Sequence, residues 1–106
     1  MSIYLPWQTA TITTTTSTTV SDAVNLQNNC EFMQVILPAL TSCSVSVHVC
    51  DTSGGTYVAL GNGVATGTTT GSYSTTFKLG GYQYIKIVTS AAQGVNRSIK
   101  VRGFKL

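Results

Sequence analysis

The segment TSCSVSVHVCD, residues 41–51, alternates more regularly between two kinds of side chain than any other part of the chain. Val45, Val47 and Val49 occupy every second position, and mainly polar residues lie between them. Successive side chains of a β-strand point to opposite faces of a sheet, so this pattern predicts a strand with one buried and one polar face. No segment shows a convincing helical period. The chain is therefore expected to build sheets that each bury one face.

Two later segments, residues 82–90 and 97–106, alternate in the same way. Aliphatic residues take their inward positions and cations their outward ones, which assigns Ile85, Ile87, Ile99 and Val101 to the core and Lys86, Lys100 and Arg102 to the exterior. If the two strands were neighbours, the three cations would share one sheet face. All six bases lie in the last third of the chain and all three acids in the first half. A basic face of this kind would suit an acidic partner surface.

Composition also favours an all-β fold. Charged residues make up only 8% of the 106 residues, whereas the hydrophobic fraction of 42% is ordinary. A disordered chain would show the opposite balance, so we expect a single folded domain. Threonine is frequent, and threonine favours the pleated, half-buried environment of a strand. Turn signals recur at roughly 8–12 residues, as in antiparallel sandwiches and jelly rolls. We therefore predict a single antiparallel, jelly-roll-like β-sandwich of about 7–8 short strands over residues 9–106, preceded by an irregular N-terminal arm at residues 1–8.

Turn and breaker residues divide the chain into short expected strands. Pro38 cannot donate a hydrogen bond to a neighbouring strand, so it should end the apolar strand over residues 31–37. Gly80 and Gly81 favour a tight reversal or a bulge. The other expected elements are strands over 9–20, 23–26 and 56–60, a polar turn at 27–29, and a flexible loop over 61–71.

The start of the chain and its cysteines bear on where the protein is made. Met1 is followed by SIYLPWQTAT, which lacks the basic and apolar regions of a signal peptide. No apolar run approaches the roughly 20 residues that a membrane-spanning helix requires. We therefore expect a protein made in the cytoplasm, without a membrane partner. Cys30, Cys43 and Cys50 are odd in number, which favours free thiols over a disulfide framework.

Groups that could perform catalysis are few. His48 is the only histidine, and a Ser/His/Asp triad with Asp22 or Asp51 would lack a nucleophile elbow and an oxyanion loop. His48 and Cys50 could supply two metal ligands, whereas zinc usually takes four. We therefore expect no enzyme activity, no cofactor and no metal site. The net charge of +3 is low for a protein that binds a duplex, which disfavours nucleic acid as a partner.

Four segments, in the order TATIT…SDAVNL, FMQVILPAL, VSVHVCDTSGGTYVAL and GGYQYIKIVTSAAQGVNRSIKVRGF, together resemble a known family. An apolar strand ends in the step Leu37-Pro38-Ala39, a turn precedes Tyr57, and a Tyr-Ile-Lys-Ile strand is followed by a final strand that Arg97 begins. Over about residues 9–104 the chain resembles the small β-sandwich decoration, or cement, proteins of tailed bacteriophages. It departs from their pattern in a shortened middle, GNGVATGTTTGSYS.

The resemblance implies a structural virion protein that docks on the shell of the major capsid protein and stabilises it. Its expected location is the capsid surface, and its expected partners are the major capsid protein and further copies of itself, with a trimer as one candidate homo-oligomer. The candidate contact residues, toward the capsid or a neighbouring subunit, are Tyr4, Trp7, Lys86, Lys100 and Arg102.

An alternative function is that of a carbohydrate-binding β-sandwich module in a phage tail or fibre. Sandwiches that bind sugars commonly present exposed aromatic side chains, because these rings are apolar and yet tolerate water at their edge. Trp7, Tyr57 and Tyr73 are the candidate platforms for a glycan.

Overall fold

The computed structural model describes residues 3–64 and 68–106, and within them nine strands pair antiparallel with no helix between them. The strands are β1 (Ile3–Tyr4), β2 (Gln8–Ile12), β3 (Val24–Ile36), β4 (Ala39–Cys43), β5 (Val45–Cys50), β6 (Val58–Val64), β7 (Thr69–Gly71), β8 (Ser74–Thr89) and β9 (Arg97–Lys105). The predicted all-β fold is therefore confirmed. Two of the strands are much longer than expected, since β3 has 13 residues and β8 has 16.

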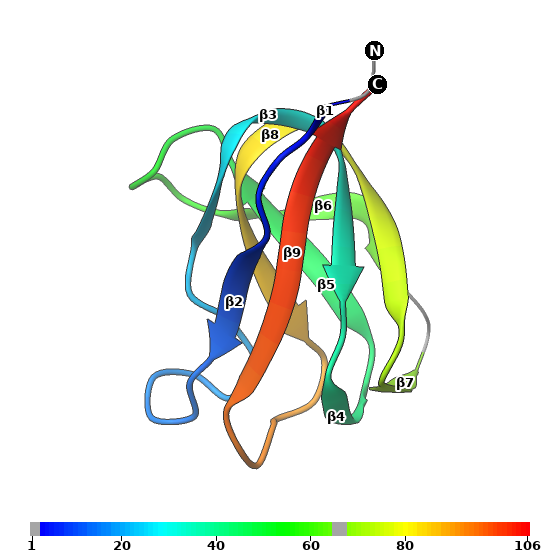
Figure 1. Ribbon diagram of the computed structural model, residues 1–106. Helices are drawn as coiled ribbons and strands as arrows, with labels where there is room; N and C mark the ends of the chain where they lie inside the picture. Colours follow the sequence, from blue (N-terminus) through cyan, green and yellow to red (C-terminus); the bar gives the residue numbers. More distant parts are fainter. Residues whose placement is uncertain (1–2, 65–67) are drawn as a thin grey trace.

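The two long strands take part in both layers of a sandwich. In the first layer, β1 and β2 pair with one edge of β9, the C-terminal half of β3 pairs with its other edge, and the N-terminal half of β8 follows. In the second layer, the N-terminal half of β3 pairs with the C-terminal half of β8, which also pairs with β5, and β6 follows. Figure 1 shows β2 and β9 in front, with β5 and the end of β8 behind them.

The long strands change direction where their pairing is irregular. The register of β3 with β8 shifts on both sides of Cys30, and three residues near these shifts have positive φ: Gln27 (77°), Gly80 (77°) and Gly81 (108°). Glycine adopts such angles without strain, so the Gly80-Gly81 pair lets β8 bend within one strand. The sequence favoured either a tight reversal or a bulge at Gly80-Gly81, and the structure shows a bulge. The predicted turn at residues 27–29 is wrong, because these residues belong to one continuous, bulged strand.

Two other sequence predictions need correction. The threonine-rich run over residues 9–20 is not one strand: β2 ends at Ile12, and an irregular segment follows. The flexible loop predicted over residues 61–71 contains the end of β6 and all of β7, which pairs with β4 in a small sheet of two strands. Residues 65–67 of that predicted loop lie outside the described residues.

Alternation correctly predicted the core. Ile85, Ile87, Ile99 and Val101 are fully buried, as are the inward valines of β5 apart from Val49, which is 2% exposed. They pack with residues from both layers, among them Ile12, Met33 and Leu79. Burial of each such side chain stabilises the fold by roughly 1.5–3 kcal/mol before entropy is counted, so the two layers are held mainly by these contacts.

The described part of the N-terminal arm, from Ile3, lies along β9 and is irregular over residues 5–7. Tyr4 pairs with Phe104, and the Leu5 amide donates to the Gly103 carbonyl oxygen over 3.0 Å. Pro6 has no amide proton, so it cannot continue this pairing. Pairing with β9 resumes at Gln8, the first residue of β2. Met1 and Ser2 lie outside the described residues, and the division into an arm at 1–8 and a domain at 9–106 stays a prediction.

The loop between β8 and β9 is held by a buried glutamine. Gln93 is 1% exposed, and its Oε1 accepts hydrogen bonds from the Thr41 amide (2.8 Å) and from Arg97 Nε (3.1 Å). Its Nε2 donates to the carbonyl oxygens of Ala91 (3.1 Å) and Thr41 (3.3 Å). This one side chain therefore ties the loop to β4, and it positions the start of β9.

Candidate functional site

The outward side chains of the first layer form the surface that we call the β9 face. Because Ile99 and Val101 are buried, the residues between and after them on β9 point outward. The register of β3 with β9 sets an outward β3 residue beside each of three outward β9 residues: Phe32 beside Phe104, Gln34 beside Arg102 and Ile36 beside Lys100. Tyr4 and Trp7 of the arm border these residues, and Ser74 and Thr76 of β8 complete the face on the other side.

Aromatic rings form a row at one end of the β9 face. The ring of Phe104 lies between the rings of Tyr4 and Phe32, with centroid distances of 5.1 and 5.2 Å and interplanar angles of 25° and 17°. Rings at such distances attract each other by about 0.5–1.5 kcal/mol beyond the area that they bury. The row therefore fixes β1 against β9, and Tyr4 remains 52% exposed at its end.

Arg102 occupies the centre of the face. Its Cζ lies 4.8 Å from the ring centroid of Tyr4 and 4.5 Å from that of Trp7, and its Nε donates a 2.7 Å hydrogen bond to Gln34 Oε1. A guanidinium over an aromatic ring is attracted by the negative face of the ring. These three contacts hold Arg102 with neutral groups, and they fix the position of the Trp7 indole at the same time.

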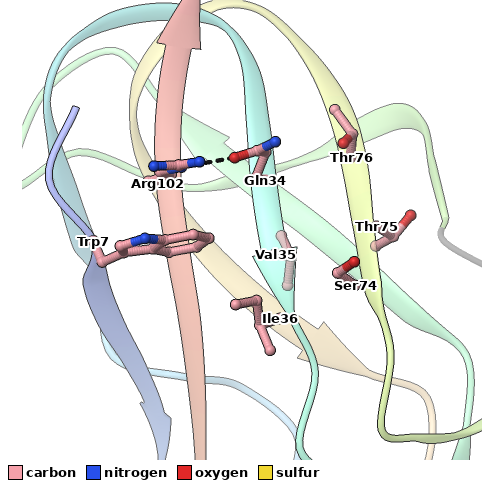
Figure 2. Close-up of a pocket in the computed structure, with 8 residues that line it drawn as sticks. All are labelled: Trp7, Gln34, Val35, Ile36, Ser74, Thr75, Thr76 and Arg102. Atoms are coloured by element: carbon pink, nitrogen blue, oxygen red, sulfur yellow. Dashed lines mark hydrogen bonds between the residues drawn. The ribbon is translucent and has the colours of Figure 1, made fainter. Parts of the chain in front are cut away.

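A groove with a volume of about 310 Å³ opens beside this cluster. Figure 2 shows the indole of Trp7 lying across β9 and pointing toward Ile36, with Ser74 and Thr76 on the opposite side. The floor of the groove, between these two sides, is formed by Gln34, Val35 and Ile36 of β3. The volume lies at the lower end of the range for small-molecule sites in proteins, which is roughly 300–1,000 Å³.

Four of the five predicted contact residues lie together, and the fifth does not. Tyr4, Trp7, Lys100 and Arg102 are on the β9 face, whereas Lys86 lies on β8 opposite His48 of β5, in the second layer. The strands β8 and β9 are not neighbours, because β3 lies between them. The basic face predicted from the three cations is therefore wrong, although each of the three points away from the core.

The other two candidate glycan platforms do not line the groove. Tyr57 directly precedes β6 in the sequence. The centroid of the Tyr57 ring lies 4.6 Å from the Nζ of Lys86. Burial raises the pKa of the Tyr57 hydroxyl above its ordinary value. Tyr73 is partly buried against the core, and its carbonyl oxygen accepts from the Leu37 amide over 2.9 Å. Of the three tyrosine and tryptophan platforms, only Trp7 lines the groove.

A second hollow, of about 240 Å³, lies between the irregular segment after β2 and Lys86. Its lining consists mainly of the hydroxyl groups of serine and threonine residues, together with Asp22, whose Oδ1 accepts the Thr11 amide over 2.8 Å. No aromatic ring is in this lining, so the hollow offers a ligand no ring to stack on, in contrast to the groove beside Trp7.

Within the part of the chain that the structure describes, no group of three or more His, Cys, Asp and Glu side chains could hold a metal ion. The same part contains no helix that could cross a membrane. Cys30, Cys43 and Cys50 are free and buried. Burial raises the pKa of the Cys30 and Cys43 thiols, which favours their neutral form.

Sequence reasoning missed the residues that complete the groove. Gln34 lies within the apolar segment FMQVILPAL. A polar residue at an outward position of such a strand could have indicated that Gln34 belongs to a surface site. Ser74 and Thr76 gave no such signal, because serine and threonine are frequent throughout the chain. Their place beside β3 follows from the pairing of β3 with β8, in which Gln34 opposes Thr76 and Ile36 opposes Ser74.

No known protein-family model matches the chain, and no curated protein matches it. The solved structures that share its fold over nearly its full length include a prophage-derived protein and a carbohydrate-binding module. One is the SPBc2 prophage-derived protein YomS, with a TM-score of 0.54 and 12% identity over 97% of this chain and 98% of the other. The second is the family 32 carbohydrate-binding module from C. perfringens NanJ, in complex with galactose, with a TM-score of 0.56 and 14% identity over 99% of this chain and 100% of the other. At these identities the likeness shows the β-sandwich fold alone.

Proposed function

We propose that this protein is a structural component of a tailed-phage particle, and that it decorates the capsid by docking its β9 face on the major capsid protein. The observation that carries the proposal is the grouping of Tyr4, Trp7, Lys100 and Arg102 on one face. The prophage-derived protein of similar fold is compatible with this role. The location that follows is the outer surface of the virion, after synthesis in the host cytoplasm.

The exposed apolar residues of the β9 face support a docking surface. Tyr4 is 52% exposed, Trp7 41% and Ile36 43%. Interfaces between proteins are enriched in aromatic residues and arginine at their centre, which matches the cluster of Tyr4, Trp7 and Arg102. Lys100 at the edge of the cluster would favour an acidic patch on the partner.

Repetition on a symmetric shell would make a modest contact sufficient. A capsid presents the same site many times, and copies of this protein that associate with each other, as a trimer or another homo-oligomer, would bind several sites at once. Linked contacts of this kind raise the overall affinity by about 10²–10⁴ without any new contact. The protein would thus stabilise the shell by bridging its subunits.

The test is co-sedimentation of the purified protein with particles that lack it. The wild-type protein should sediment with the particles and raise their resistance to heat. Lys100→Glu should weaken binding at least tenfold, because it reverses a charge in the contact. Lys86→Glu is the matched control, since it makes the same change in the other layer, and it should bind as the wild type does.

Two results would contradict the proposal. If the wild-type protein fails to sediment with such particles at any salt concentration, the decoration role is wrong. If Lys86→Glu abolishes binding and Lys100→Glu does not, the second layer makes the contact.

A further inference from the structure

We infer that the groove beside Trp7 is a binding site for a neutral pyranose unit of a polysaccharide. This inference goes beyond the proposed docking role and does not depend on it, because it concerns a ligand of the free protein; on a particle, the proposed contact would cover Trp7. The groove has about 310 Å³ of space, which is enough for a small ligand or for one unit of a longer chain.

The two sides of the groove differ in chemistry, as the two parts of a sugar do. A pyranose ring has a face of C–H groups and a rim of hydroxyl groups. The indole of Trp7 on one side is 41% exposed and can stack on the C–H face. Ser74 and Thr76 on the other side are exposed hydroxyl groups that both donate and accept hydrogen bonds.

The floor between the two sides is also suited to a sugar. The Gln34 amide borders the groove, and only its Oε1 is engaged by Arg102, so Nε2 can donate to a hydroxyl of the ligand. Ile36, beyond the end of the indole in Figure 2, extends the apolar side of the groove. An apolar ligand would leave the hydroxyl groups of the opposite side without partners, which disfavours a lipid or an aliphatic side chain.

The polar residues of the lining favour a neutral sugar, because all of them except Arg102 are uncharged. Arg102 is the only charged residue in the lining of the groove. Its guanidinium already lies against the rings of Tyr4 and Trp7 and donates through Nε to Gln34. The Arg102 guanidinium therefore positions the indole of Trp7. The Nη groups of Arg102 can still donate to a sugar hydroxyl or to a carboxylate, and the acidic probe below tests which of these the groove accepts.

Trp7 is the only tryptophan of the chain, so its fluorescence reports on this groove alone. The probes are soluble galactomannan and β-glucan as neutral polysaccharides and polygalacturonate as the acidic one. Addition of at least one neutral probe to the purified protein should shift the emission of Trp7 to shorter wavelength and reduce its quenching by acrylamide. Polygalacturonate should leave both properties unchanged.

Affinity electrophoresis in gels that contain the same probes tests the site with variants. Trp7→Ala and the double variant Ser74→Ala/Thr76→Val should lose at least nine-tenths of the retardation by the neutral probe. Val95→Ala is the matched control, because it also shortens an exposed apolar residue, in the loop before β9, and it should keep the retardation.

The inference is overturned if neither neutral probe changes the fluorescence, or if only polygalacturonate does. It is also overturned if Trp7→Ala, folded by circular dichroism, is retarded as strongly as the wild-type protein. These outcomes leave the docking role untouched, since that role is measured with phage particles and in the absence of polysaccharide.

Discussion

Replacing Arg102 by methionine tests whether this side chain organises the β9 face. Methionine keeps much of the aliphatic stem and removes the guanidinium, so the variant loses two cation–π contacts and the hydrogen bond to Gln34. Each cation–π contact at a part-exposed site contributes about 0.5–1 kcal/mol, and the hydrogen bond about 1 kcal/mol. We therefore expect Arg102→Met to lower the free energy of unfolding by about 2 kcal/mol.

Urea denaturation followed by Trp7 fluorescence measures this loss. The midpoint should fall without a change in the slope m, and the melting temperature should fall by about 8–16 °C. Lys100→Met is the matched control on the same strand and face, and a surface substitution of this kind should change stability by less than about 0.5 kcal/mol. If Arg102→Met also costs less than about 0.5 kcal/mol, the reasoning about this cluster is refuted.

Three further predictions concern the rest of the fold. Gln93→Leu should lower stability by about 3 kcal/mol in urea denaturation, because it removes the partners of the Thr41 amide and carbonyl groups; a loss below about 1 kcal/mol would contradict this. Gly103→Ala should cost about 1–3 kcal/mol, because the added Cβ would meet the Cys30 side chain, and Cys30→Ala in the same chain should recover most of that loss. Since burial raises the pKa of the Cys30 and Cys43 thiols, both should resist a thiol reagent at pH 8 until urea is added; rapid labelling of the folded protein would argue against it.

The parts of the fold that depend on local alternation could be predicted from the sequence. The inward positions of β5, β8 and β9 follow from the period of two, because each strand carries that signal within its own residues. The strand boundaries were harder to predict. A bulge and a turn use the same residue types, so the asparagine-rich segment at 27–29 could not be told from a loop before its pairing with β8 was known.

The candidate site depends on pairings between distant parts of the chain. Trp7 and Arg102 come together because β1 and β2 both pair with β9, which joins the two ends of the sequence. The same information was needed to separate Lys86 from Lys100, since it is β3 that lies between β8 and β9. Alternation gave the face of each cation within its strand, but it contains nothing about the order of strands in a sheet.

A cryo-electron microscopy reconstruction of particles carrying the protein tests the central claim most directly. We predict that the β9 face will lie against the shell, with Tyr4, Trp7 and Arg102 in the contact and Lys86 in solvent. A reconstruction in which the second layer faces the shell, while the rings of Tyr4 and Trp7 are open to water, would contradict the account.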